Sequence, residues 1–150
     1  MSDRSQARIT CSMLDADLLA QEVLGCDNAA SVSEPPMIRN LLGKRVIEMS
    51  EEEVPYGGLH EAESFKDKYP DVPFILSWES AGSGTYPAGS NAYSRSDVGS
   101  CSLDDTGAPI VSVDDFGEPN VEELHQVRCY LKIVREALEE MVQRLPAEPV

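Results

Sequence analysis

The sequence NVEELHQVRCYLKIVREALEEMVQRLP, residues 120–146, decides the fold class because it predicts one long amphipathic helix. Asn120 is a favoured N-cap residue, Glu123 follows at the spacing of a capping box, and Pro146 ends the helix. We therefore predict a helix over about residues 120–145. Its apolar residues recur alternately at three and four positions, which is typical of a buried stripe: Leu124, Val127, Leu131, Val134, Leu138, Met141 and Leu145.

This stripe fits two kinds of packing. Ile133 and Val142 widen it beyond the narrow seam of a coiled coil, which favours packing across a sheet in the same domain. The heptad-like spacing also fits a homo-oligomer or a partner helix. Both interpretations are kept.

Upstream of this helix, strand-like runs alternate with shorter helical segments. The run VPFILSWE (72–79) is almost continuously apolar, as central strands are. GKRVIEM (43–49) predicts a second strand, and VGSCSL (98–103) with APIVSVDD (108–115) predicts a hairpin. Helices are expected over LHEAESFKDKYP (59–70) and at least from Asp15 to Leu24, with a strand or more helix before Asp15.

Together these elements predict a single acidic α+β domain over residues 1–150. We expect about four mainly antiparallel strands, packed against the long C-terminal amphipathic helix and the shorter helices. No internal repeat is evident.

The stretch SWESAGSGTYPAGSNAYSRSDVGSCS (77–102) is rich in small residues and poor in aliphatic ones. It lacks the Lys-Ser/Thr pair of a P-loop and a helix directly after it, which argues against a phosphate cradle. Mixtures of Tyr, Ser, Gly and Asn are typical of adaptable recognition loops. We therefore predict a mobile loop over about residues 80–97 whose partner-binding residues are Tyr86, Asn91, Tyr93 and Arg95.

The net charge is extreme. The chain has 27 acidic residues against 12 Lys and Arg, a formal net charge of -15. Such a field repels nucleic acids and anionic membranes, so we expect neither direct nucleic-acid binding nor membrane binding. It would attract a protein with a basic surface, and Glu51, Glu52 and Glu53 are predicted to contribute to that contact, although acidity also serves solubility.

Catalytic and metal-binding motifs are weak. Residues 105–108 read DTGA, the letters of an aspartic-protease turn, but a hairpin turn between Asp104 and Pro109 explains them more simply. His60 and His125 stand outside any metal-ligand spacing, and the four cysteines form no C-x-x-C pair. We expect no catalytic residue, no cofactor and no metal. The absence of a signal-like or bilayer-spanning segment predicts a cytoplasmic protein with reduced thiols.

The sequence therefore favours a non-enzymatic protein–protein interaction module, such as an inhibitor, an immunity or anti-defence factor, or an adaptor. One alternative is a structural or assembly component of a virion or other large particle. Another is a small enzyme or small-molecule binder, with a pocket under residues 80–102 that contains His60 or His125.

Overall fold

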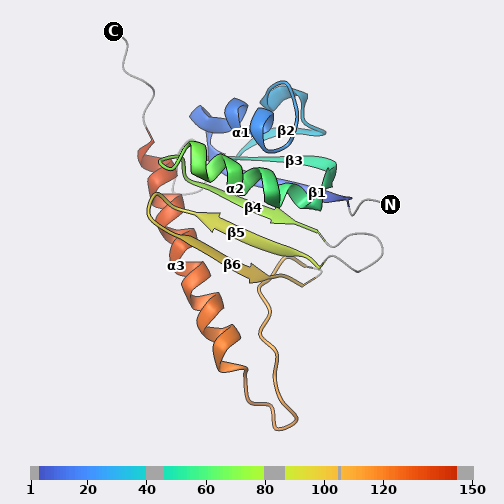
Figure 1. The fold of residues 1–150 in the computed structure, drawn as a ribbon, viewed down its shortest axis with the longest axis vertical. Helices are drawn as coiled ribbons and strands as arrows, with labels where there is room; N and C mark the ends of the chain where they lie inside the picture. Colours follow the sequence, from blue (N-terminus) through green and yellow to red (C-terminus); the bar gives the residue numbers. More distant parts are fainter. Residues whose placement is uncertain (1–3, 40–45, 80–86, 105, 145–150) are drawn as a thin grey trace.

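A computed structural model describes residues 4–39, 46–79, 87–104 and 106–144. Its centre is one antiparallel sheet of six strands in the order β2-β3-β1-β4-β5-β6 (Figure 1). The strands are β1 (Arg4–Ser12), β2 (Glu34–Arg39), β3 (Val46–Pro55), β4 (Phe74–Trp78), β5 (Gly89–Tyr93) and β6 (Val98–Ser102). The helices are α1 (Ala16–Glu22), α2 (Leu59–Lys68) and α3 (Val121–Gln143), with short 3-10 turns at Met13–Asp15, Ala29–Ser31 and Tyr56–Gly58.

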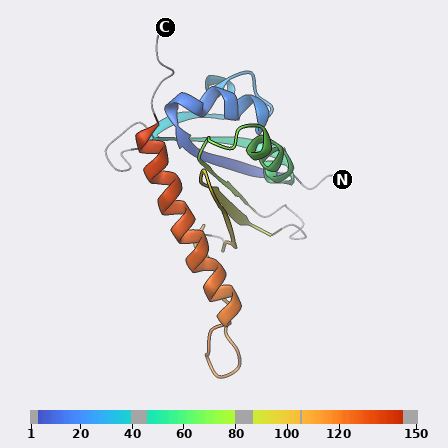
Figure 2. The same ribbon diagram turned by 60° about the vertical axis from the view of Figure 1, so that its left-hand side comes forward.

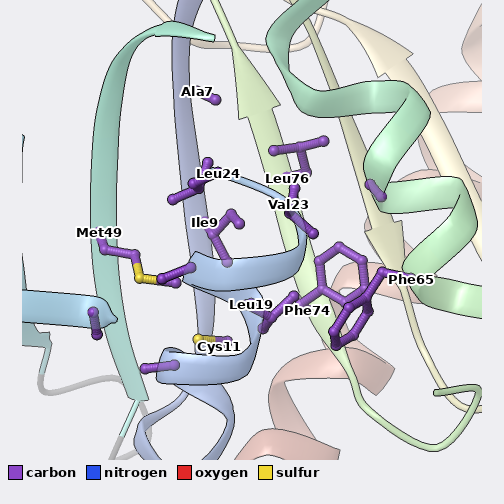
Figure 3. Close-up of a cluster of buried hydrophobic side chains, with 14 of the residues drawn as sticks. Ala7, Ile9, Cys11, Leu19, Val23, Leu24, Met49, Phe65, Phe74 and Leu76 are labelled. Carbon is purple, nitrogen blue, oxygen red and sulfur yellow. The ribbon is translucent and has the colours of Figure 1, made fainter. Parts of the chain in front are cut away.

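This architecture confirms the α+β prediction, with six strands instead of about four. Each face of the sheet carries its own apolar core. On one face α1 and α2 cover Ile9, Phe74 and Leu76 (Figure 3). On the other face α3 covers Ile75 and Ala92, since neighbouring strand residues point to opposite faces. None of the helices in the described ranges combines the length and apolar character needed to cross a bilayer.

Helix α3 packs across the sheet, as the wide apolar stripe indicated. The centre of the contact is rotated around the helix from the predicted seam and consists of Tyr130, Ile133, Ala137 and Met141, of which Met141 belongs to that seam. The other seam residues that the structure describes lie at the margin, and Leu131 is 50% exposed. The stripe therefore extends beyond what the sheet covers.

Both ends of α3 are fixed by side chains. At its start the Asn120 side chain accepts the N–H of Glu123 at 3.0 Å, as predicted. The capping box is not reciprocal, because the Glu123 carboxylate binds Ser112 instead. At its end the Arg144 guanidinium donates to both carboxylate oxygens of Asp15, at 2.9 and 3.0 Å, and these bonds raise the pKa of Arg144. The helix is thereby tied to the 3-10 turn that follows β1.

Glycine at position 99 sets how closely α3 approaches β6. A Cβ there would lie 2.9 Å from the Tyr130 Cα and 3.1 Å from the Ile133 Cγ1. We predict that Gly99→Ala lowers the free energy of unfolding by roughly 1–3 kcal/mol, because helix backbone must move to relieve the overlap. Denaturant unfolding measures this change. Ser100→Ala, at the exposed neighbouring position, is the matched control, and equal stability of the two variants would contradict the packing described here.

Several strand predictions need correction. The N-terminal segment begins with a strand, β1, and its helix starts only at Ala16, so the strand-then-helix alternative holds. Residues 108–115 form no regular strand and make only isolated bridges. Strand β3 continues through Pro55, beyond the end predicted at Met49, because pairing with β1 outweighs the poor strand propensity of three consecutive glutamates.

Part of the predicted mobile loop is also a strand. Residues 89–93 form β5, which lies between β4 and β6 and is buried throughout. The Tyr130 hydroxyl donates to the Ser90 Oγ at 2.8 Å, and the Ser77 hydroxyl donates to the same oxygen at 2.9 Å. These bonds satisfy the buried polar side chain, so a strand without large aliphatic residues can occupy the interior.

Two buried thiols predict a loss of stability at alkaline pH. Burial raises the pKa of Cys101 from 9.0 to about 11 and raises that of the fully buried Cys11 further. Both thiols stay protonated in the folded chain when those of the unfolded chain ionise. Stability is therefore complete below pH about 9 and falls above it, by at most about 1.4 kcal/mol per pH unit for each thiol.

Urea unfolding between about pH 8 and 10 tests this prediction. Burial also raises the pKa of Tyr93 and of Tyr130 above 10.0, so both tyrosines add to the loss near pH 10 in every variant. The variant Cys101→Ala should lose stability less steeply with pH than the natural chain. An identical pH dependence in both proteins would show that this thiol is not the cause.

Candidate functional site

The most distinctive surface is the connection between β6 and α3, residues 108–120, which we call the arm. The arm projects beyond the sheet and ends in a tight turn (Figures 1 and 2). In that turn the Asp114 Oδ1 accepts the N–H groups of Phe116 at 2.8 Å and of Glu118 at 2.9 Å. Gly117 supplies the required positive φ of 82° and donates its N–H to the Asp114 carbonyl. The turn is thus fixed by its own hydrogen bonds.

The base of the arm is bonded to the start of α3. The outgoing and returning segments of the arm are joined by a hydrogen bond from the N–H of Asn120 to the carbonyl of Ser112, 2.8 Å apart. Ser112 also donates its backbone N–H and its hydroxyl to the two carboxylate oxygens of Glu123, at 2.6 and 3.2 Å. The tip of the arm is therefore held in place relative to the helix.

The turn of the arm repeats a turn ten residues earlier. LDDTGAP (103–109) and VDDFGEP (113–119) share Asp, Asp, Gly and Pro at equal spacing. In the first copy the Asp104 Oδ1 accepts the N–H groups of Thr106 and Ala108, and Gly107 has a φ of 86°. The bonds from Thr106 and Ala108 lower the pKa of Asp104. These two turns are a short internal repeat, so the expectation that the sequence contains no repeat is wrong.

The arm exposes apolar side chains that a folded protein would normally bury. Phe116, at its tip, is 91% exposed. Among the described residues, eight large hydrophobic side chains are classed as exposed, and half of them belong to the arm or the residue after it: Ile110, Val113, Phe116 and Val121. Scattered single exposures are ordinary, but a group of them on one projecting element is typical of an interaction site.

The charge around these side chains has a single sign. Residues 96–127 contain no lysine or arginine and eight acids: Asp97, Asp104, Asp105, Asp114, Asp115, Glu118, Glu122 and Glu123. The arm therefore presents an aromatic ring within a concentrated negative field, a combination that matches an apolar hollow with a basic rim.

Two of the predicted partner-binding residues are buried in the sheet. Tyr86 lies outside the described residues. Asn91 and Tyr93 are 9% and 1% exposed, and the Asn91 amide donates to the Tyr93 hydroxyl at 3.0 Å. The prediction that these two side chains are on a mobile surface loop is wrong, because their strand is paired on both sides.

Arg95 is exposed in the turn between β5 and β6, and its backbone N–H donates to Glu140 of α3 at 2.8 Å. Glu51 to Glu53 lie on β3, where Glu51 accepts the N–H and the hydroxyl of Ser33. Glu52 and Glu53 are exposed. A partner role for Arg95 and these acids stays a prediction.

One hollow in the described part of the chain gathers polar and charged side chains, including two carboxylates, Glu79 and Asp104. This hollow, of about 420 Å³, lies at the ends of β1 and β4 and also includes Arg8, Ser77 and Thr106. Neither His60 nor His125 lines this hollow, and both are exposed, with the His125 Nε2 3.6 Å from the exposed Cys129 Sγ. In the described ranges no group of three or more His, Cys, Asp or Glu side chains is placed to hold a metal ion.

Comparison of the chain with models of known protein families, with curated proteins and with solved structures gave no match.

Proposed function

We propose that this chain is a protein–protein interaction module that binds a partner protein through the tip of the arm. The observation that carries the proposal is the 91% exposure of Phe116 on a turn that is fixed by hydrogen bonds. Burying such a ring stabilises by roughly 1.5–3 kcal/mol. Because folding leaves the ring exposed, this free energy is available to binding. Phe116 is thus placed as an anchor residue.

The geometry of the arm favours binding in a second way. Ordering a flexible loop costs free energy on association, and a prefolded turn has already met that cost. The bonds of Asp114 and Glu123 hold the tip before any partner arrives. A rigid projecting turn can enter a hollow on another protein, as inhibitor loops do.

The charge of the arm specifies the chemistry of the partner. Acids surround the tip without compensating cations in residues 96–127, so the matching surface carries lysine and arginine around an apolar pocket. Nucleic acids and anionic membranes are disfavoured by the same field. An inhibitor or adaptor that acts on a basic protein fits these properties.

Affinity purification at low and high salt, followed by quantitative mass spectrometry, tests the proposal. The triple variant Asp115→Asn, Glu118→Gln, Glu122→Gln removes charge and leaves Asp114 to hold the turn. We expect a partner that is recovered in smaller amounts with this variant and at high salt, because both weaken attraction between opposite charges. A partner bound equally by both proteins at both salt concentrations would contradict the role of the acids.

A further inference from the structure

Strand β6 forms one edge of the sheet, and its outward backbone groups are open over most of its length. Leu103 donates its N–H to Ala88, on the β5 side, whereas the Ser102 carbonyl accepts the N–H of Ile110 on the outer side. Since alternate residues point the same way, the N–H and C=O groups of Val98 and Ser100 also face outward. Within the described residues no hydrogen bond reaches these four groups.

The edge also lacks the features that usually prevent strand addition. Its sequence, VGSCS, contains no charge and no proline, and Val98 is 52% exposed. The opposite edge of the sheet, β2, contains Pro35 and Pro36, which have no N–H to donate. Natural proteins protect exposed edges with charges, prolines or bulges, so an unprotected edge indicates a site for another strand.

Helix α3 extends past this edge and would cover one face of an added strand. Gly99 lies under Tyr130, and the helix continues from there towards the arm (Figures 1 and 2). Residues 121–129 add about 13 Å of helix, whereas one more strand needs about 4.8 Å. On this overhang Val127 is only partly buried and offers an apolar contact from the α3 side.

A shallow groove of about 390 Å³ runs along the same edge, from α2 on one side of the sheet to Gln126 of α3 on the other. Ser100, Ser102 and Asn91 line it, and the charged residue in its lining is Glu63 of α2. An added strand would therefore meet Val127 of α3 on one face and the Glu63 carboxylate on the other. Because strand side chains alternate between faces, alternate apolar and basic residues fit best.

We propose that β6 binds an extended segment of the partner protein as a seventh strand, with apolar residues towards α3 and lysine or arginine towards Glu63. This inference rests on the proposed function, because the edge lies beside the arm and would meet the same basic partner. Backbone bonds to Val98 and Ser100 would supply affinity, and the alternation would supply specificity.

The probe is a synthetic peptide of alternating valine and lysine, with an alternating valine and glutamate peptide as its control. Binding to the intact chain is followed by NMR through the exchange of backbone amide hydrogens with solvent. We expect the lysine peptide to slow exchange at Val98 and Ser100, and to leave Gly99 and Cys101, already bonded to β5, unchanged. The glutamate peptide should not bind.

Three variants make the result decisive. Ser100→Pro removes one outward N–H without breaking the bonds to β5 and should weaken peptide binding about tenfold or more, whereas Ser100→Ala should not. Val98→Lys places a like charge on the edge and should also weaken binding, independently of any effect of proline on folding. Absence of peptide binding, or binding that Ser100→Pro and Val98→Lys leave intact, would overturn the inference.

The variant Phe116→Ala separates this inference from the proposed function. It should bind the peptide as the natural chain does, because the Phe116 side chain is 91% exposed and its loss leaves β6 unchanged. If the peptide binds and partner capture does not need Phe116, the role of the arm fails and the role of β6 stands. If the peptide does not bind and partner capture does need Phe116, the role of β6 fails and the role of the arm stands.

Discussion

Phe116→Ala is expected to reduce affinity for the partner protein by about tenfold or more, which corresponds to at least about 1.4 kcal/mol. The ring is 91% exposed in the free protein, so its removal takes little from the folded state. We expect the free energy of unfolding to change by less than about 0.5 kcal/mol. Calorimetric titration with the purified partner measures affinity, and denaturant unfolding measures stability.

Phe116→Leu is the matched control for this variant. Leucine keeps an apolar side chain at the tip, so it should retain part of the affinity that alanine loses. The turn should be unchanged in both variants, because Asp114 bonds the backbone of residue 116 and not its ring. Unchanged affinity in Phe116→Ala would show that the tip is not the anchor.

Phe74→Ala should affect stability and not affinity. We expect a loss of about 3–5 kcal/mol in the free energy of unfolding. Phe74 is completely buried on β4. Its ring stacks on Tyr93 at a centroid distance of 4.4 Å and meets the edge of Phe65 at 5.3 Å. Alanine would leave a cavity between α2 and the sheet, and thermal or denaturant unfolding measures the cost.

The two phenylalanine variants control for each other. Each removes the same group, one from the interior and one from the tip of the arm (Figure 3 shows Phe74). Phe74→Ala should bind the partner normally under conditions in which it remains folded. Similar losses of stability in both variants would contradict the placement of these two side chains.

The C-terminal helix was predictable because its signals are local and agree. The Asn120 cap, the apolar stripe and the following proline all lie within one segment, and the helix spans Val121–Gln143. The position of its buried centre was not predictable. Tyr130 and Ala137 face the sheet because Gly99 lets the helix approach there, a contact between segments far apart in the sequence.

Strand β5 was missed because its burial comes from its neighbours. The sequence GSNAY has the composition of a loop, and only pairing with β4 and β6 makes it central. Its polar side chains are bonded inside the protein, Ser90 to Tyr130 and Asn91 to Tyr93. Propensity is a weak guide where tertiary pairing decides.

The arm had a signal in the sequence that was interpreted too narrowly. The repeat of Asp-Asp-x-Gly-x-Pro in LDDTGAP and VDDFGEP predicts two similar turns ten residues apart. Considering only the first copy led to a hairpin with residues 108–115 as a strand. The exposure of Phe116 could not be predicted, because it depends on the arm projecting away from the sheet.

Site-specific photocrosslinking in the native cell tests whether the tip of the arm touches the partner. Benzoylphenylalanine is introduced in place of Phe116 in the full chain, and in place of the exposed His60 on α2 as the control. We predict a crosslink to one basic protein from position 116 and none to that protein from position 60. A partner that crosslinks from position 60 and not from position 116 would contradict binding through the arm.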